Sequence, residues 1–583
     1  MFALFLLAVQ LGLVVGHGHQ PDFSASAQNL DDPLPFFFPD NSSSAGTPFP
    51  MPNCYGVIIE EASIVALQKH LKKGSLTSAQ LTECYLRRIN QVDQFVEAIM
   101  EVNPDVLAIA HALDAERAAG RVRGPLHGIP FVVKDNIATK DKMETTAGFW
   151  GLLGSIVPRD AHVVKRLREA GAVLLGHSTL SEWADMRSND YSEGYSPRGG
   201  QARSPYNLTM NAGGSSTGSG GAVASNEVTF ALGTETDGSV ISPSERSGLV
   251  GLKPTVGLTS RAGVIPESEH QDTVGVLAKS VADAAAVLGV IAGVDPRDNY
   301  TLAQIEAPDR TFDDYTQFLA GPESLNGSVW GIPWQSFWTQ TNPLDLDGLF
   351  SALHAIKAAG GTIINGTELP NWQTIVSPDG WDWDYGSTRG FPNESEYTVV
   401  KVDFYNNIKT YLSELNNTNI RSLEDIVAYN DANVGTEGGV PGIHPAFASG
   451  QDGFLASLAS KGIRNETYWQ ALEFCQRSTR EEGIDAALKY TKKNGKQGKL
   501  DGLLVPSNTA VTYQIAAQAG YPMITIPAGV NSYGMPYGLG IMNTAWSEPS
   551  LVKWASAIEA ILPSRPTPKW LAYTAKNIPV DSE

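Results

Sequence analysis

The chain is poor in cysteine and carries no metal-binding motif. Its 583 residues include only three cysteines, Cys54, Cys84 and Cys475. Three cysteines at these spacings allow at most one internal disulfide and match no zinc-site pattern. The ten histidines form no His-Glu-x-x-His motif, so a metalloprotease of that type is excluded. We therefore expect no metal and no cofactor, and we interpret Cys84, which falls in a helical pattern, as a buried thiol.

The chain is also poor in basic residues and in long apolar segments. Lysine and arginine total 42 against 62 acidic residues, a net charge of −20, and no basic block occurs. Such a balance argues against a nucleic-acid partner and favours simple solubility. The apolar run from Phe2 to Val15 lacks acidic residues, ends in small residues and is short for a membrane span. It predicts a signal peptide over residues 1–18, with no membrane span in the mature chain.

Glycosylation sequons support an exported, extracellular protein. Eight asparagines stand in Asn-x-Ser/Thr with x other than proline. They are Asn41, Asn207, Asn299, Asn326, Asn365, Asn393, Asn416 and Asn465. Asn207 lies close to a glycine-rich stretch and is expected to be too buried for modification. Oligomeric state is left open by the sequence.

The order of local patterns predicts one large α/β domain. Helical spacing alternates with short apolar runs, as in chains that build a central sheet covered by helices. Helices are expected within 63–92, 106–121, 161–170 and 548–562, and strands at 129–133, 172–176, 228–232, 500–505, 523–527 and 538–542. The domain would span 60–565, between an extended arm over 19–59 and a tail over 566–583.

A looser, tryptophan-rich stretch interrupts this pattern at about 298–400. Six tryptophans gather there: Trp330, Trp334, Trp338, Trp372, Trp381 and Trp383. We interpret the stretch as an insertion packed over the core, ahead of the alternative that it forms a substrate-facing wall.

Residues 211–255 carry the strongest chemical signal. A glycine- and serine-rich run holds Ser215, an apolar run follows, and a second small-residue turn holds Ser239. Glycines at this density let backbone N–H groups crowd around one point. A serine hydroxyl needs a base before it acts as a nucleophile. Lys134, at the end of a short apolar strand, is the best candidate, since burial can keep a lysine neutral.

Two other nucleophile motifs are weaker. Residues 214–218 match G-x-S-x-G, but the polar segment before them is not the strand that motif requires. Residues 550–553 match S-x-x-K within an ordinary surface-helix pattern, without a partner motif. His127 and His162 are interpreted as structural.

Several stretches together resemble the amidase signature family of Ser-Ser-Lys hydrolases. They are GPLHGIPFVVKDNI at 124–137, the run at 213–221, the turn and strand at 233–255, and 521–527. The resemblance covers roughly residues 60–565. The runs at 145–148, 180–184, 198–201 and 234–239 are most similar to the peptide-amidase branch. The resemblance implies an amidase-signature fold, which is a single domain with a mixed central β-sheet covered on both faces by helices.

The resemblance also implies a role for each site residue. Ser239 would be the acylated nucleophile, Ser215 the bridging serine after a cis peptide bond, and Lys134 the terminal base. Backbone N–H groups from Thr236 through Asp237 and Gly238 to Ser239 would bind the oxyanion.

The chain departs from the common family turn at three positions. Glu235 stands for Asp and Asp237 for Gly, variants that the peptide-amidase branch shares. Ile241 replaces an arginine, and Arg246 is the candidate to supply the lost positive charge.

The expected function is hydrolysis of a carboxamide or of a peptide's C-terminal amide outside the cell. The substrate would be a small molecule or a short peptide. A subunit of a tRNA-linked amidotransferase is disfavoured by the signal peptide. The alternative is a secreted, catalytically inert amidase-like binding protein.

Overall fold

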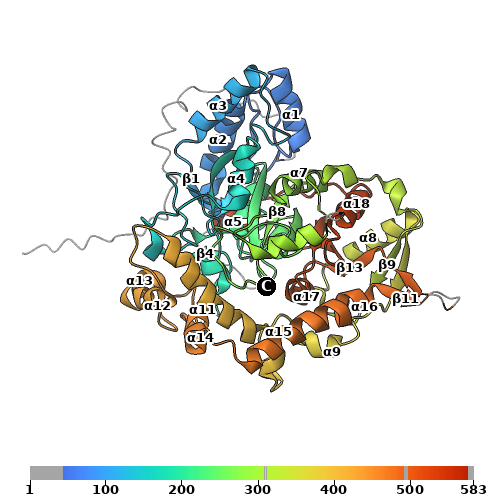
Figure 1. Ribbon diagram of the computed structural model, residues 1–583. Coiled ribbons are helices and arrows are strands. Elements are labelled where there is room, and N and C mark those ends of the chain that lie inside the picture. The colour runs from blue at the N-terminus through green and yellow to red at the C-terminus, as the bar shows by residue number, and fades with distance from the viewer. Residues whose placement is uncertain (1–43, 308, 310, 492–494, 496, 576–583) are drawn as a thin grey trace, which may run out of the picture.

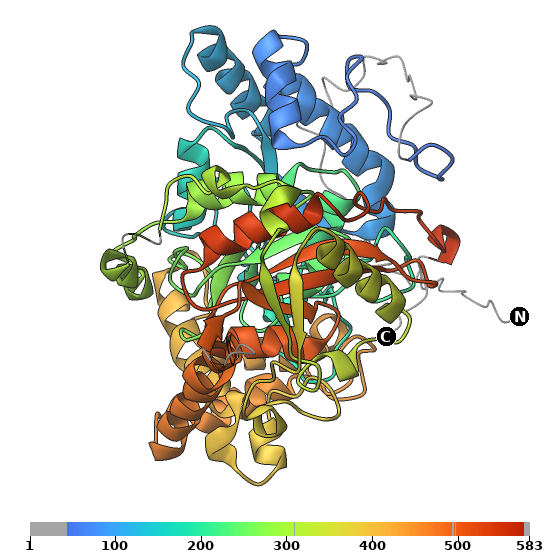
Figure 2. The same cartoon turned by 90° about the vertical axis from the view of Figure 1, so that its right-hand side faces the viewer.

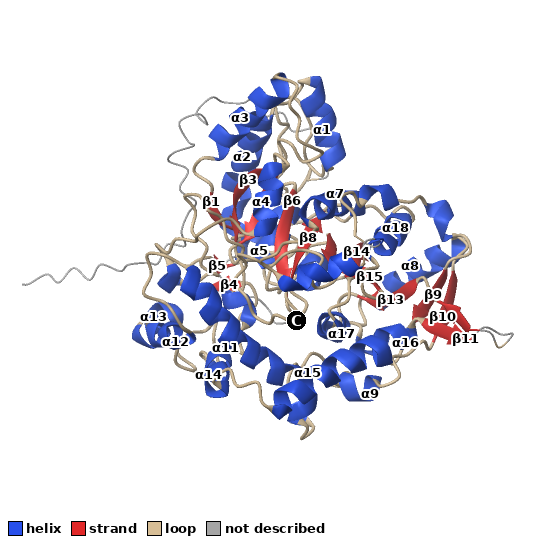
Figure 3. Ribbon diagram, viewed as in Figure 1, coloured by secondary structure: helices blue, strands red, loops and turns tan. Residues whose placement is uncertain are grey.

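A central β-sheet of eleven strands organises the computed structural model, which describes residues 44–307, 309, 311–491, 495 and 497–575 (Figure 3). The strand order is β1-β3-β2-β6-β8-β7-β14-β15-β13-β9-β10. These strands are β1 (Ile99–Val102), β2 (Pro130–Lys134), β3 (Val173–Ser178), β6 (Phe230–Glu235), β7 (Val250–Lys253), β8 (Thr273–Ala278), β9 (Val329–Ile332), β10 (Thr362–Asn365), β13 (Gly502–Pro506), β14 (Met523–Val530) and β15 (Pro536–Met542). Two short pairs stand apart, β4 (Tyr195–Ser196) with β5 (Gly200–Gln201) and β11 (Lys489–Thr491) with β12 (Gln497–Lys499).

The sheet is mixed, as the family resemblance implied. β2 pairs in parallel with both β3 and β6, and β9 pairs in parallel with β10 and β13. The strands between these groups, from β6 across to β13, pair antiparallel. Strands β2, β6, β8, β13 and β15 are buried along their whole length, as expected for a sheet covered on both faces.

Helices pack on both faces of this sheet (Figures 1 and 2). One group, α4, α7 and α18, packs together on one face, while α5 and α6 pack together against several of the same strands from the other. The helices up to α7 are α1 (Ile64–Lys73), α2 (Ser78–Val96), α3 (Val106–Ala118), α4 (His162–Glu169), α5 (Thr217–Ala224), α6 (Ile241–Arg246) and α7 (Val281–Ile291). Those after it are α8 (Leu346–Ala358), α9 (Trp372–Ile375), α10 (Tyr385–Thr388), α11 (Glu396–Glu414), α12 (Leu423–Ala432), α13 (Val434–Glu437), α14 (Asp452–Ser460), α15 (Glu466–Thr479), α16 (Asp485–Ala487), α17 (Ala510–Ala519) and α18 (Glu548–Glu559).

Local signals explain where several helices begin. Thr77 and Gln80 form a reciprocal capping box at the start of α2, and Ser63 caps α1 through its side chain. The predicted helices at 63–92, 106–121, 161–170 and 548–562 are confirmed, with ends shifted by a few residues. Helices α11 to α15 form an arc that lies away from the α1–α3 end of the molecule (Figure 1).

The tryptophan-rich stretch is only partly an insertion, which corrects the sequence interpretation. It supplies β9 and β10, two strands at one end of the central sheet. Trp330 on β9 is fully buried, and Trp338 is buried with its indole N–H donating to the carbonyl of Leu504 on β13. Trp381 and Trp383, by contrast, line the cavity next to Ser239 that is described below. The stretch thus contributes both to the central sheet and to the wall of the cavity.

The described part of the arm is attached to the domain rather than extended. Cys54 forms a disulfide with Cys84 on α2, so the interpretation of Cys84 as a buried thiol is wrong and the one internal disulfide that the sequence allows is present. Cys475 is the free, buried cysteine of the described residues. In the tail, Trp570 is buried and its N–H donates to the carbonyl of Pro205. The predicted signal peptide lies outside the described residues.

The helices that the structure describes were also compared with the length and apolarity that a bilayer demands. None of them is both long enough and apolar enough to cross one.

Candidate active site

The parallel pairing of β2 and β6 brings two distant segments to one edge of the sheet. Val133 on β2 is in register with Leu232 on β6, so the carboxyl ends of both strands lie at the same edge of the sheet. Lys134 is the last residue of β2, and the glycine-rich turn begins directly after β6. The Asn136 amide donates to Thr234 Oγ1 at 2.9 Å and ties the two strand ends together. Carboxyl ends of neighbouring parallel strands are a common place for a binding site.

A continuous chain of hydrogen bonds joins the three residues predicted as a catalytic triad. Lys134 Nζ donates to Ser215 Oγ at 2.6 Å, and Ser215 Oγ donates to Ser239 Oγ at 2.9 Å. Lys134 and Ser215 are fully buried, whereas Ser239 retains 3% exposure and lines a cavity that is described below. The chain can carry a proton from a cavity-facing hydroxyl to a buried amine.

Ser215 is held by its backbone as well as by its side chain. The Gly214–Ser215 peptide bond is cis, which confirms the expectation for this position. The Ser215 carbonyl accepts from the N–H of Ser181, and the N–H of Ser216 donates to the Ser239 carbonyl at 3.3 Å. The two serine-bearing turns are therefore joined through backbone and side chain alike.

The glycine run beside Ser215 allows close backbone packing. Helix α5, which follows Ser215, is buried along its whole length. A Cβ at Gly218 would lie 2.5 Å from the backbone of Ala98 and of Thr179. Glycine at this position lets the helix approach its neighbours, and this approach sets the position of Ser215.

Burial lowers the pKa of Lys134 to about 8, from an ordinary value near 10.5. Desolvation is the largest cause, because the charged ammonium is disfavoured away from water. Negative charge on Glu267, Asp185 and Glu193 acts in the opposite direction and limits the shift. A lysine in this environment is neutral in a useful fraction of molecules at neutral pH.

The carboxyl group of Glu235 stabilises the conformation of the turn after β6. Its Oε2 accepts from the N–H groups of Val240 at 2.8 Å and Ile241 at 3.0 Å. Gly238 has φ +81°, and a Cβ there would lie 2.4 Å from the Tyr513 ring. Only glycine fits this point of the turn without strain.

Three N–H groups of the same turn remain available to a ligand. Within the described residues, no acceptor takes the N–H of Thr236, Asp237 or Ser239. Their peptide units border the cavity together with the Ser239 hydroxyl. Donors grouped in this way can stabilise negative charge that develops on an oxygen beside Ser239.

The side chains of Thr236 and Asp237 point to different partners. Thr236 Oγ1 donates to Asp272 Oδ1 at 2.6 Å. Asp237 Oδ2 accepts from the indole N–H of Trp381 at 2.6 Å, while its Oδ1 is buried and has no hydrogen-bond partner within the described part of the chain. Burial and the nearby Glu396 raise the pKa of Asp237 well above its usual range.

A cavity of about 280 Å³ opens above Ser239, and its wall is acidic. Burial is the largest cause of a raised pKa for every carboxyl group on this wall. These groups belong to Asp185, Glu193, Asp237, Glu267 and Glu396. Sequence reasoning singled out Asp237 alone among them, because the other four stand in no motif that would mark them.

Arg246, at the end of α6, supplies the positively charged side chain of the cavity wall. Its Nη1 donates to the carbonyl of Asn211 at 2.9 Å. Ile241, where the family has arginine, is fully buried. Arg246 thus lies at the cavity, while its role as a substitute for that arginine stays a prediction.

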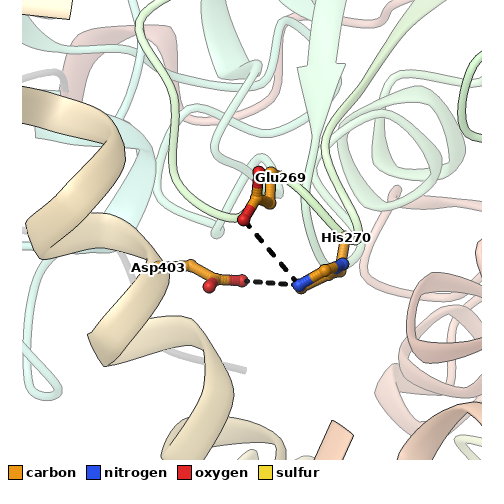
Figure 4. Close-up of side chains that lie close together, drawn as sticks. All are labelled: Glu269, His270 and Asp403. Carbon is orange, nitrogen blue, oxygen red and sulfur yellow. Dashed lines mark ion pairs between the residues drawn. The ribbon is translucent and has the colours of Figure 1, made fainter. Parts of the chain in front are cut away.

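A cluster of Glu269, His270 and Asp403 lies at the joint between the sheet and α11 (Figure 4). Its groups already have protein partners. Arg464 pairs with both carboxylates, and the Tyr300 and Tyr468 hydroxyls hydrogen-bond the two ring nitrogens of His270. The Arg464 guanidinium already supplies positive charge to both carboxylates. These ion pairs link α11, which carries Asp403, to the loop before β8, which carries Glu269 and His270.

The G-x-S-x-G match at 214–218 borders the cavity at Gly214, but Ser216, at its nucleophile position, is buried and donates its hydroxyl to the Thr234 carbonyl. The other candidates lie away from the cavity. The His127 ring contacts the Leu113 carbonyl, and His162 lies near Asp295, so both are placed as structural side chains. Lys553, from the S-x-x-K match, is exposed on α18 and lies over the ring of Trp554.

Comparison with known proteins finds one family. The sequence profile of the family described as Amidase matches residues 80–416. A Schizosaccharomyces pombe protein named as an amidase is 58% identical over 547 residues, covering 94% of this chain and 92% of that protein. The native peptide amidase from Stenotrophomonas maltophilia is similar in structure, with a TM-score of 0.75 and 39% identity over 87% of this chain and 98% of that chain. A complex of the peptide amidase with the competitive inhibitor chymostatin gives a TM-score of 0.76 and 39% identity over 87% of this chain and 99% of that one.

Proposed function

Because this chain belongs to the amidase family of hydrolases that act on carbon–nitrogen amide bonds, we propose that it cleaves its substrate through an acyl-enzyme on Ser239. Ser215 bridges this nucleophile to the base, Lys134. The observation that carries the proposal is the unbroken chain of hydrogen bonds from the buried amine to the cavity-facing hydroxyl.

The proton movements follow from this chain. Neutral Lys134 accepts a proton from Ser215 as Ser215 accepts one from Ser239, and Ser239 Oγ attacks the amide carbon. The tetrahedral oxyanion is bound by the N–H groups of the turn from Thr236 to Ser239. The proton returns through Ser215 to the leaving nitrogen, the C–N bond breaks, and ammonia or an amine departs. Water then attacks the ester by the same route and releases the acid.

The proposed substrate is the C-terminal amide of a short peptide or a small carboxamide. Similarity to a peptide amidase over most of the chain supports a peptide substrate, as does the inhibitor complex of that protein. The cavity above Ser239 is lined by aromatic and polar side chains, a combination typical of small-ligand sites.

Amide hydrolysis by a Ser239→Ala variant tests the nucleophile. We expect the variant to fold normally and to lose turnover of amidated peptides, with Ser244→Ala as the matched control. Ser244 is a buried serine on α6, shortly after Ser239 in the chain, and its hydroxyl donates to the carbonyl of Val240. Normal turnover by Ser239→Ala would refute the assignment. Wild-type protein that binds amides without cleaving them would instead indicate the inert binding protein.

The protein is also proposed to be secreted. The apolar run from Phe2 to Val15 and the eight sequons support export. Mass spectrometry of protein from the culture medium should find a mature N-terminus close to residues 17–20 and N-glycans on several sequons. Retained Met1 with no glycan would contradict this proposal.

A further inference from the structure

A second cavity, of about 180 Å³, lies next to the one above Ser239. Arg246 lines both cavities, so the two spaces lie next to each other at this residue. A single water molecule needs only about 10–15 Å³ of such space, so the second cavity can hold a small chemical group. No motif of the sequence pointed to this space, and the proposed reaction at Ser239 does not use it.

Asp345 in this cavity has an unusual hydrogen-bonding state. It stands at the N-cap of α8, where an aspartate normally accepts from the first N–H groups of the helix. Here the side chain makes no cap bond and instead accepts from the Asn508 amide at Oδ2, at 2.5 Å. Asp345 retains 3% exposure, and burial raises its pKa, with the side chains of Asn531 and Asn508 acting in the opposite direction as hydrogen-bond donors. Its Oδ1 has no partner of good hydrogen-bond geometry among the described residues.

The neighbouring Asn508 leaves a second acceptor unused. Its Oδ1 is buried and also without a partner in the described part of the chain. Two buried acceptors without donors are costly in the empty protein, since each loses water without gaining a hydrogen bond. A ligand group that brings several donors and a positive charge would satisfy both. A primary ammonium has this chemistry.

Arg246 offers the complementary chemistry at the junction of the two cavities. Its guanidinium donates to the carbonyl of Asn211, and its positive charge acts on the carboxyl groups of Glu245 and Asp345. Its remaining N–H groups suit a carbonyl oxygen of a peptide. A peptide backbone that passes Arg246 presents such carbonyls on the way from one cavity to the other.

We propose that Asp345 and Asn508 form a subsite for the N-terminal ammonium of a short peptide amide whose C-terminal amide lies at Ser239. The acyl portion of the substrate runs past Arg246 from the first cavity into the second. The proposal rests on the proposed function at Ser239 and adds the substrate class: short peptide amides with a free N-terminus.

The charge of the surroundings favours this occupant. Five carboxyl groups and one arginine line the first cavity, and Glu245 joins Asp345 in the second. Burial raises the pKa of each of these carboxyl groups, so they attract a cation only as they ionise, and a bound ammonium favours that ionised form. An anionic group has Arg246 as its cationic partner among the residues that line the two cavities. Ordered water in the second cavity is the competing occupant.

Binding to a Ser239→Ala variant tests the subsite without turnover. The ligands are alanine amides of one to three residues, each paired with its des-amino analogue, in which hydrogen replaces the ammonium group. Affinities are measured by calorimetry at pH 7. Most α-amino groups are charged at this pH, since their pKa is about 7.7–8.0. At the length that reaches Asp345, we expect the ammonium ligand to bind about 10- to 100-fold more tightly, the range for a hydrogen bond to a charged group. Equal affinity for both members of every pair would overturn the proposal.

The matched variants are Asp345→Asn and Asp347→Asn, both built on Ser239→Ala. Asp347 is exposed on the same helix and lines neither cavity, so its substitution removes the same charge from the same element. Asp345→Asn should lose the preference for the ammonium, and Asp347→Asn should keep it. A preference that survives Asp345→Asn overturns the proposal. The melting temperature of each variant shows whether it folds. If Asp345→Asn does not fold, the ligand pairs measured on Ser239→Ala with Asp345 intact still decide the question.

Turnover by the protein with Ser239 intact separates this inference from the proposed function. Hydrolysis of the des-amino analogues without any ammonium preference would reject the subsite and keep the amidase chemistry. An ammonium preference in binding, without hydrolysis of any amide, would keep the subsite and reject the chemistry at Ser239.

Discussion

Lys134 can act as a base only while it is neutral, so activity should follow its ionisation. With the pKa of Lys134 lowered to about 8, about one-tenth of molecules carry the neutral amine at pH 7. A solvated lysine, with a pKa of about 10.4, would be neutral roughly 200-fold less often. The pKa is lowered, so protonation on the acid side removes activity. We expect kcat/KM to rise about ninefold from pH 6 to pH 7, and about tenfold more before it levels near pH 9.

Substitution at Lys134 separates a base from a structural cation. Lys134→Ala should lose most activity, and Lys134→Arg should not restore it, because guanidinium stays charged at any usable pH. The matched control is Lys279→Arg. Lys279 is also buried, burial lowers its pKa to about 8 as well, and it lines neither cavity described above.

The assay is the initial rate of ammonia release from a peptide amide across pH 5 to 10, with the melting temperature of each variant recorded. Near-normal rates with Lys134→Arg would refute the role of base, even if Ser239 remained the nucleophile. A rate that does not change with pH between 6 and 8 would refute it as well.

Three further predictions concern the turn, the disulfide and the sequons. Gly238→Ala should lower kcat by about 100-fold or more, the scale of a lost oxyanion donor, because a Cβ meets Tyr513; Gly366→Ala, at φ +79° in open space, should retain activity. Replacing Cys54 and Cys84 with serine should lower the free energy of unfolding by about 2–4 kcal/mol, seen as a lower melting temperature; an unchanged value would contradict a stabilising role. Glycopeptide mapping should find N-glycans at exposed sequons and none at Asn207, which is partly buried and donates to the Tyr533 carbonyl. The exposed sequons are Asn299, Asn326, Asn365, Asn416 and Asn465.

The acidic wall bears on both proposals. Glu267, Asp185 and Glu193 raise the pKa of Lys134 against the larger effect of burial. Neutral carboxyl groups cost less to bury than ionised ones, which is the physical reason that their own pKa values are raised. A bound ammonium would favour their ionised forms. Charge in the substrate is thus expected to influence both binding and the base.

Much of the architecture was determined by local sequence alone. Alternating helical and strand patterns predicted an α/β domain, and the apolar run before Lys134 predicted a strand that ends at that residue. These signals can be read because the chemistry of a strand, a cap or a turn lies in neighbouring residues. The predicted positions of Lys134, Ser215 and Ser239 depended on motifs of this kind, and the structure brings the three side chains together.

Tertiary structure alone decided the features that join distant residues. Trp381 meets Asp237 although 144 positions separate them, and Asp345 meets Asn508 across 163 positions. Neither pair forms a pattern along the chain, because packing of the sheet and its covering helices brings the partners together. The same reason explains the tryptophan-rich stretch, in which Trp330 is buried on a sheet strand while Trp381 lines the cavity. Both lie in the same tryptophan-rich stretch, and the path of the backbone places one in the core and the other on the wall.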